Sequence, residues 1–249
     1  MQSSRQYDGA GFLYDLVYAD APDDTTFWES VASDAAEILE VGCGTGRVLR
    51  QFSTRKIMGL DIDSTMLSWG RQNTLKHQDI PLVAGDAAQL PLADESFDTV
   101  IAPRGLLSHM ISTRRQGLVA NELLRVCRQG GTVAVDVPDL RPYTKVGHRS
   151  VSYTKTLRTR TREWTVKTTS NYRPGKNSMV TRHAVCMSEP AGQTTHGAFE
   201  VESYVFTPSS LWRVFASVDA AQRLALRPRA ATRYNAGRLR LIVRKGWTV

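Results

Sequence analysis

Short apolar runs alternate with segments of helical periodicity in the first half of the chain. Five runs have the length and composition of buried strands: 37–41, 56–60, 81–84, 97–102 and 131–137. Three further segments repeat apolar residues at helical spacing: 46–53, 64–75 and 115–128. Strands that alternate with helices predict a parallel sheet whose ligands bind at the carboxyl ends of the strands.

Beyond Pro138 the pattern becomes that of antiparallel strands. Residues 151–167 are rich in Thr and in aromatic or β-branched residues, which predicts one long strand or two. The Pro-Gly turn at 173–177 leads to a hairpin partner at 179–185, and a third strand is expected at 199–206. These segments predict a β-rich insertion after the fifth strand of the parallel sheet.

Three arginines of this insertion stand at two-residue spacing: Arg158, Arg160 and Arg162. On a single strand they would project from one face, roughly 7 Å apart. Glu200 and Glu202 of the third strand could then pair with them. This face could bind an anionic acceptor, join a partner chain or simply be solvated.

The two ends of the chain are predicted to add further elements. Apolar residues at near-helical spacing over 12–17 predict a short amphipathic helix. Thr207-Pro208 has the character of an N-cap followed by the first residue of a helix over 209–218. The runs 224–226 and 239–243 are expected to form an antiparallel pair at the edge of the sheet.

A glycine-rich loop follows the first predicted strand. Its three alternating glycines, Gly42, Gly44 and Gly46, precede a helical pattern. Glycines let the backbone pass close to a ligand, and the next helix would aim its free N–H groups at that ligand. Arg47 stands where a dinucleotide fingerprint requires its third glycine, so pyridine dinucleotides are disfavoured.

Two carboxylates flank this loop. Glu40, at the end of the first strand, would repel a pyrophosphate but favour a ligand with an ammonium or sulfonium charge. Asp61 stands 19 positions after Gly42, close to the spacing of roughly 20 at which a carboxylate accepts hydrogen bonds from ribose hydroxyls. Together the two favour S-adenosylmethionine (SAM), which carries both positive groups and a ribose.

Five successive motifs resemble those of class I SAM-dependent methyltransferases, in the same order: ILEVGCGTG, GLDID, GDAAQLPL, FDTVIAP and LLRVCRQGGTVAVDV. The similarity covers about residues 36–137. It implies an α/β, Rossmann-like fold with a seven-stranded sheet and an antiparallel β-sheet inserted after the fifth strand. It further implies an N-terminal helical lid at 1–35, a SAM-binding core at 36–138 and 201–249, and a substrate or oligomer region at 139–200.

The resemblance also assigns residues to the cofactor. Those expected around the methionyl moiety are Glu40, Gly42, Gly44 and Gly46. Those expected around the ribose and the adenine are Asp61 and Ile62, then Asp86 and Ala87. Further cofactor contacts are expected from Tyr7, Cys43, Met66 and Ala102. No metal is expected, since the sequence offers no ligand cluster for one.

Methyl transfer from a sulfonium is an in-line displacement with a neutral leaving group, so the enzyme mainly aligns the acceptor with the methyl carbon. His109 follows the fourth strand, in a loop that faces the same crevice as the glycine loop. It could take a proton from an amine acceptor or orient that amine, or it could be a packed histidine. The histidines at other positions are expected to be structural or surface residues: His77, His148, His183 and His196.

The N-terminal segment resembles the lids of small-molecule methyltransferases, in which tyrosines face the methyl group or the acceptor. On this resemblance Tyr14 could hydrogen-bond to the acceptor, with Tyr7 and Tyr18 as weaker candidates. The three tyrosines could instead only anchor the segment on the core.

Composition limits the possible classes of protein. The net charge of +8 over 249 residues can favour nucleic acid, an anionic small molecule or only solubility. Nucleic acid is disfavoured because no RNA-binding motif is present and Ala102-Pro103-Arg104 replaces the N-P-P-Y-type sequence of base N-methyltransferases. Three cysteines without disulfide or metal spacing, and the lack of an apolar signal or membrane span, predict a cytoplasmic protein.

The flanks of the core resemble small-molecule methyltransferases of secondary metabolism, including antibiotic biosynthesis. A tyrosine-bearing lid and a histidine after the fourth strand are shared with enzymes that N-methylate amino sugars, including nucleotide-linked deoxysugars. The expected activity is therefore N-methylation of a small, possibly anionic or nucleotide-linked amine, with S-adenosylhomocysteine as the second product. The alternatives are O-methylation of a sugar or phenol, nucleic-acid methylation and SAM binding without catalysis. The insertion could also form a homodimer.

Overall fold

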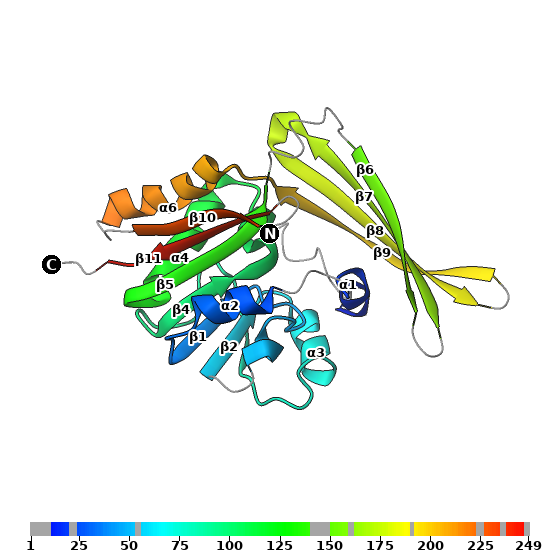
Figure 1. Cartoon of the computed structure of the whole chain (residues 1–249), viewed down its shortest axis with the longest axis horizontal. Helices are drawn as coiled ribbons and strands as arrows, with labels where there is room; N and C mark the ends of the chain where they lie inside the picture. Colours follow the sequence, from blue (N-terminus) through cyan, green and yellow to red (C-terminus); the bar gives the residue numbers. More distant parts are fainter. Residues whose placement is uncertain are drawn as a thin grey trace.

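The computed structural model describes residues 11–19, 24–52, 56–139, 150–158, 162–189, 192–222, 227–234 and 238–246. In these residues the chain forms a seven-stranded sheet and a separate four-stranded sheet. Helix α1 (Gly11–Val17) lies between the two sheets (Figure 1).

The seven-stranded sheet has the strand order β10-β11-β5-β4-β1-β2-β3. Its strands are β1 (Glu37–Val41), β2 (Lys56–Asp61), β3 (Leu82–Ala84), β4 (Phe97–Ala102), β5 (Cys127–Pro138), β10 (Arg227–Tyr234) and β11 (Arg238–Arg244). Strands β1 to β5 are parallel, whereas β11 runs antiparallel to both β5 and β10. The central strands are apolar because helices cover both faces. The predicted parallel sheet is confirmed, although the fifth strand begins at residue 127 and not at 131.

Helices cover the sheet in two layers. Helices α4 (Thr113–Val126) and α6 (Pro208–Gln222) pack on one face, and α2 (Thr25–Val31) and α3 (Ser64–Gln72) on the other. The predicted helix over 46–53 is wrong for its described part: the chain forms turns and then the short 3₁₀ helix η1 (Leu49–Phe52). Gly44 and Gly46 have positive φ angles, so the loop continues through the expected first turn of the helix. The predicted strand at 224–226 lies outside the described residues, and β10 begins at Arg227.

The second sheet is an antiparallel meander in the order β6-β7-β8-β9. Its strands are β6 (Ser150–Arg158), β7 (Glu163–Arg173), β8 (Ser178–Glu189) and β9 (Gly192–Tyr204). The predicted inserted sheet is therefore confirmed, and its first segment is two strands. The expected domain limits and the homodimer through this sheet stay predictions.

The hairpin between β6 and β7 shows that the expected single face of three arginines is wrong. Arg158 ends β6 and its Nε donates to Glu163 at 2.6 Å, while Arg162 precedes β7. Arg160 lies outside the described residues. The expected partner Glu202 accepts from Ser178 at 2.8 Å instead, and Glu200 lies opposite Arg182 in the register.

Helix α1 joins the two sheets. Its apolar residues pack on one half of a face of the second sheet, where Trp164, Val166 and Val185 are buried. On its other side the Asp15 carboxylate accepts hydrogen bonds from Thr45 Oγ1 and Trp69 Nε1, each at 2.7 Å. The predicted helix near 12–17 is confirmed, and these contacts hold it beside the glycine loop.

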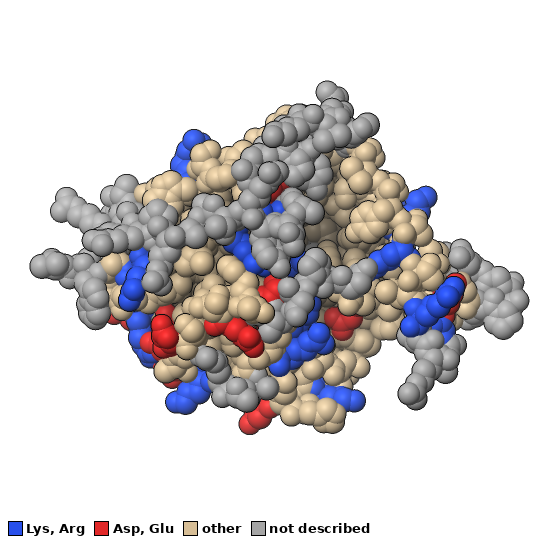
Figure 2. All heavy atoms as spheres, in the orientation of Figure 1, with Lys and Arg blue, Asp and Glu red and all other residues tan. Residues whose placement is uncertain are grey.

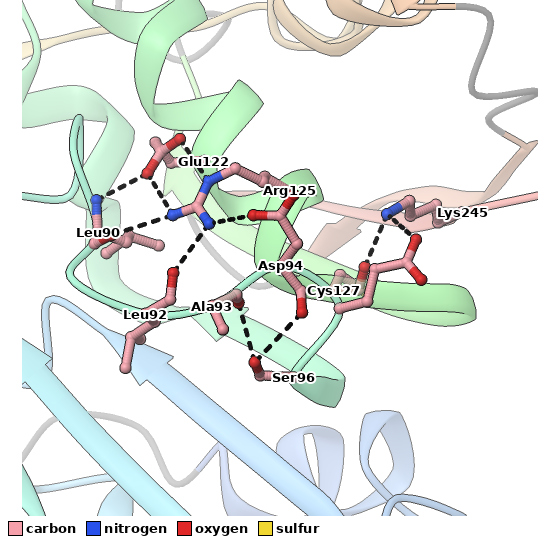
Figure 3. Close-up of polar contacts among 10 residues, drawn as sticks. Leu90, Leu92, Ala93, Asp94, Ser96, Glu122, Arg125, Cys127 and Lys245 are labelled. Carbon is pink, nitrogen blue, oxygen red and sulfur yellow. Dashed lines mark hydrogen bonds and ion pairs between the residues drawn. The ribbon is translucent and has the colours of Figure 1, made fainter.

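A polar network anchors the segment between β3 and β4 to helix α4 (Figure 3). The Arg125 guanidinium donates to the carbonyls of Leu90 and Leu92 at 3.0 and 2.8 Å, and to the carboxylates of Glu122 and Asp94. Glu122 in turn accepts from the Leu90 backbone N–H at 2.7 Å. Arg125 therefore satisfies backbone carbonyls of a segment that has little regular structure of its own.

We expect Arg125→Met to lower the free energy of unfolding by about 2 kcal/mol, because the substitution leaves two carbonyls and two carboxylates without their donor. Urea unfolding followed by circular dichroism measures the change. The matched control is Arg158→Met, which removes one exposed ion pair and should cost less than about 0.5 kcal/mol. Equal effects of the two substitutions would show that the network is not stabilising.

Candidate functional site

A cavity of about 460 Å³ lies between the carboxyl ends of the parallel strands and one half of the second sheet. Nine of the predicted site residues line it: Tyr14, Gly42, Gly44, Asp61, Ile62, Met66, Asp86, Ala87 and His109. These residues come from α1, the glycine loop, α3 and the loops after β2, β3 and β4. The structure therefore brings the expected cofactor residues and the expected catalytic residues to one space.

Asp61 organises the donor end of the cavity. Its Oδ2 accepts from the Gly44 backbone N–H at 2.7 Å, and its Oδ1 accepts from the Asp63 backbone N–H at 2.9 Å. Asp63 then caps α3 by accepting from the backbone N–H groups of Thr65 and Met66. Burial raises the pKa of Asp61 although these hydrogen bonds lower it. One carboxylate thus fixes both the glycine loop and the start of α3.

Glu40 lies behind the glycine loop and is only 2% exposed. Burial raises the pKa of its carboxyl group well above the usual range, although nearby Arg47 lowers it. Among the described residues, no group donates a hydrogen bond to Glu40 Oε2. Arg47 itself pairs with Asp24 at 2.7 Å. Glu40 is not among the residues that line the cavity, so its contact with a cationic ligand group stays a prediction.

Three other predicted cofactor residues lie behind the cavity wall. Cys43, Gly46 and Ala102 are not among the residues that line the cavity. A Cβ at Gly46 would come within 2.7 Å of Leu75, so this glycine allows the loop to pack on the core. Tyr7 lies outside the described residues. Direct contact of these residues with the cofactor stays a prediction.

The expected adenine end contains an ion pair that the sequence did not indicate. Both oxygens of Asp86 accept from Arg115 Nη2, at 2.8 and 2.7 Å, and Oδ1 also accepts from the Ala88 backbone N–H. Although burial raises the pKa of Asp86, these hydrogen bonds lower it overall. Arg115 belongs to the first turn of α4 and also lines the cavity.

These features fit the chemistry of SAM. Carboxyl groups suit its ammonium, sulfonium and ribose hydroxyls, and the glycine loop leaves room for the molecule. Gly42 has a φ of +76°, and a Cβ on it would come within 2.9 Å of Leu106. Another residue at this position would push the loop and the cavity wall apart.

The acceptor end begins with a sharp turn directly after β4. Arg104 and Gly105 have φ angles of 59° and 96° inside the 3₁₀ segment η2 (Pro103–His109). The turn brings His109 to the cavity, where burial and the positive charge of Arg238 lower its pKa to about 4. His109 is therefore neutral at physiological pH.

Tyr14 of α1 and Tyr18, directly after this helix, cover this end. Tyr14 and Tyr18 are in ring contact at 4.6 Å between centroids, and burial raises the pKa of both phenols. The Arg104 guanidinium lies 5.1 Å from the Tyr18 ring centroid, in a cation–π contact. The phenols thus keep their protons and can donate hydrogen bonds.

Sequence reasoning missed several residues of the acceptor end. Arg104 could have been predicted from the sequence in the same way as His109, because both residues follow the fourth strand. Arg238 begins β11 beside the carboxyl end of β5 and pairs with Asp136. His183, expected to be structural or on the surface, is buried and lines the cavity from β8. No sequence signal shows which face of an inserted sheet covers the site.

Residues 38–131 match the family model described as "Methyltransferase domain". These residues, which include the glycine loop, Asp61 and His109, are therefore similar to methyltransferase domains. Phosphatidylethanolamine N-methyltransferase of Cereibacter sphaeroides is 37% identical over 109 residues, which are 42% of this chain and 52% of that protein. Demethylmenaquinone methyltransferase of Renibacterium salmoninarum is 32% identical over 119 residues, which are 45% of this chain and 47% of that protein. The chain thus spans about half the length of these curated relatives.

Solved structures of methyltransferases match nearly the whole chain. DesVI of Streptomyces venezuelae has a TM-score of 0.77 and 20% identity, over 92% of this chain and 95% of its own. CalS10 is an amino pentose methyltransferase from Micromonospora echinaspora involved in calicheamicin biosynthesis. It has a TM-score of 0.72 and 17% identity, over 94% of this chain and 96% of its own. KedS8, a sugar N-methyltransferase of a Streptoalloteichus species, has a TM-score of 0.71 and 16% identity, over 92% of each chain. At these identities the likeness shows the fold, and it confirms the methyltransferase fold with its inserted sheet.

In the described part of the chain, no group of three or more His, Cys, Asp or Glu side chains is placed to hold a metal ion. No described helix is long and apolar enough to cross a lipid bilayer.

Proposed function

We propose that the chain transfers a methyl group from SAM to the amine of a small metabolite of the amino-sugar kind. The observation that carries this proposal is the shared cavity, in which the glycine loop and Asp61 meet His109 and Tyr14. When bound, SAM supplies an electrophilic methyl group on a positively charged sulfur. The carboxyl groups at the donor end favour that charge, and the acceptor end is left to hold the nucleophile.

The acceptor end suits alignment more than strong base catalysis. With a pKa of about 4, His109 is a weak base that can accept a hydrogen bond from an amine N–H. Tyr14 offers a phenolic donor to a second polar group of the acceptor. An amine that arrives neutral would be held with its lone pair toward the methyl group, and the proton released afterwards would pass to solvent.

Positive charge at the acceptor end supports an acceptor with an anionic group. Arg104 and Arg238 line this end, whereas the carboxylates that line the cavity belong to the donor end: Asp61, Asp63 and Asp86. No carboxylate of the described residues forms an ion pair with Arg104, whose charge burial disfavours. A phosphate of a nucleotide-linked sugar or a carboxylate would supply the missing charge.

Three alternatives differ in the acceptor. O-methylation of a sugar would use the same cavity, with a hydroxyl in place of the amine. The curated relatives include quinone and phospholipid methyltransferases, whose names indicate more apolar acceptors. Nucleic acid is less favoured, because Figure 2 shows Lys and Arg interspersed with Asp and Glu on the described part of the visible face.

The proposal is tested by incubating the protein with SAM and single acceptors: amino sugars, nucleotide-linked amino sugars, phenols, a demethylated menaquinone and phosphatidylethanolamine vesicles. S-adenosylhomocysteine is followed by mass spectrometry, and the position of the new methyl group is read by NMR. We expect turnover with an amino sugar and a methyl group on its nitrogen. A methyl group on oxygen would favour the O-methyl alternative, and turnover of only the quinone or the lipid would contradict the proposal.

A further inference from the structure

One face of the second sheet changes from apolar to polar along its strands. The apolar half packs against α1. The other half lines the cavity with the polar residues Thr168, Ser170, Thr181, His183 and Ser203, beside the apolar Met179 and Val201. In the register, Thr168 lies opposite His183 and Ser170 opposite Thr181. If this half served only to pack against other elements, we would expect apolar residues, because buried polar groups require hydrogen-bond partners. The polar half therefore indicates a ligand with several polar groups.

His183 is the central residue of this polar half and is only 3% exposed. Its ring lies in contact with Phe199, 4.9 Å between centroids, and with Tyr18 at 6.0 Å. Its Nδ1 is 2.9 Å from Thr168 Oγ1. Burial, together with the charge of Lys155, lowers its pKa to about 4, so the ring is neutral and has one protonated nitrogen.

Thr168 determines which nitrogen carries the proton. The Thr168 hydroxyl is buried, and a buried hydroxyl proton requires an acceptor. Within the described residues, His183 Nδ1 is the hydrogen-bond partner of Thr168 Oγ1. The hydroxyl therefore donates to Nδ1, which leaves the proton of the neutral ring on Nε2. The described residues supply no acceptor for this Nε2–H, and the ring lines the cavity.

We infer that His183 is a specificity-determining residue whose Nε2–H donates a hydrogen bond to a hydroxyl or ring oxygen of the acceptor. With the hydroxyls of Ser170, Thr181 and Ser203 it selects a polyhydroxylated, sugar-like acceptor over an apolar quinone or lipid. A site that donates to a substrate oxygen rejects analogues without that oxygen, since its buried donor is then left unpaired. This inference rests on the proposed function and adds the part of the acceptor that is recognised.

The kinetic test compares His183→Phe and His183→Gln, using the amino sugar that the wild-type protein methylates fastest. The Phe variant keeps an aromatic ring without the donor, so KM for the amino sugar should rise about 10- to 100-fold while kcat stays within a few-fold. The Gln variant, whose amide can donate, should recover most of the loss. The Kd of S-adenosylhomocysteine, measured by calorimetry, should be unchanged in both. His196→Phe is the matched control, because His196 is exposed and contacts Trp164 in the apolar half.

Deoxy analogues of that amino sugar identify the contact. The analogue lacking the recognised oxygen should show the same KM with the wild-type protein and with the Phe variant. If the wild-type protein methylates amino sugars and the Phe variant keeps its KM, this inference is wrong and the proposed function stands. If only the quinone or the lipid is methylated, both are wrong.

A measurement without any acceptor tests the assignment of the proton. In the ¹⁵N-labelled wild-type protein, NMR should show His183 with Nε2 protonated and Nδ1 unprotonated at neutral pH. Thr168→Val removes the hydroxyl donor and should shift the tautomer balance toward protonated Nδ1. A wild-type ring that is protonated at Nδ1 would overturn the inference even if no acceptor is turned over.

Discussion

Asp61→Ala is expected to weaken SAM binding by about 10²- to 10³-fold. The alanine variant loses the carboxylate expected to accept from the ribose hydroxyls, and it also releases the backbone N–H groups of Gly44 and Asp63. Hydrogen bonds to a charged group contribute about 1.5 to 3 kcal/mol each, and about 1.4 kcal/mol corresponds to a factor of ten. Two such contacts at about 1.5 to 2 kcal/mol each, the lower part of this interval, account for the expected range.

Calorimetric titration with SAM and with S-adenosylhomocysteine measures this effect. Asp61→Asn keeps one acceptor oxygen and should give an intermediate loss. Asp34→Ala, at an exposed position outside the cavity, is the matched control and should bind as the parent does. Circular dichroism checks that each variant is folded. If Asp61→Ala binds SAM as tightly as the parent, the ribose assignment is wrong.

The parallel sheet and its ligand-binding edge could be predicted because each strand is a buried apolar run that ends in a functional loop. The strand at 37–41 and the carboxylate at Asp61 are examples, since local sequence alone determines both. The same local rule places His109 near the glycine loop, because loops after neighbouring parallel strands meet at one edge. Local signals were thus sufficient wherever the position of a residue depends only on the parallel strand that it follows.

The placement of the inserted sheet could not be predicted, because it depends on contacts between distant segments. The spacing of Arg158, Arg160 and Arg162 is compatible with one strand, but the register of β6 with β7 makes a hairpin there. His183 follows an alternating pattern that assigns two faces without showing which of them covers the cavity. The packing of α1 against the apolar half of the sheet, together with contacts between β9 and η2, places the polar half at the site.

His109→Phe is expected to lower kcat about 10²-fold or more while the Kd of S-adenosylhomocysteine stays unchanged. The position lies at the acceptor end of the cavity, and the Phe ring has no nitrogen, so the amine would lose its hydrogen-bond acceptor in the aligned geometry. Tyr14→Phe should cost less, because it removes one phenolic donor and keeps the ring contact with Tyr18. Single-turnover kinetics at saturating SAM measures the chemical step separately from product release.

The pH dependence gives this prediction a second readout. Because the pKa of His109 is about 4 in the folded protein, its protonation should not limit kcat until the pH falls below about 5. Any acid limb near or above pH 6 should come from the acceptor amine and persist in His109→Phe. The folded pKa also lies below the ordinary value of 6.5, so the unfolded chain binds more protons in this window and the free energy of unfolding falls as the pH drops from about 6.5 toward 4. His109→Phe should remove this share of the acid sensitivity. A kcat limb near pH 6.5 that disappears in the variant would instead show that His109 is solvated and acts as an ordinary base.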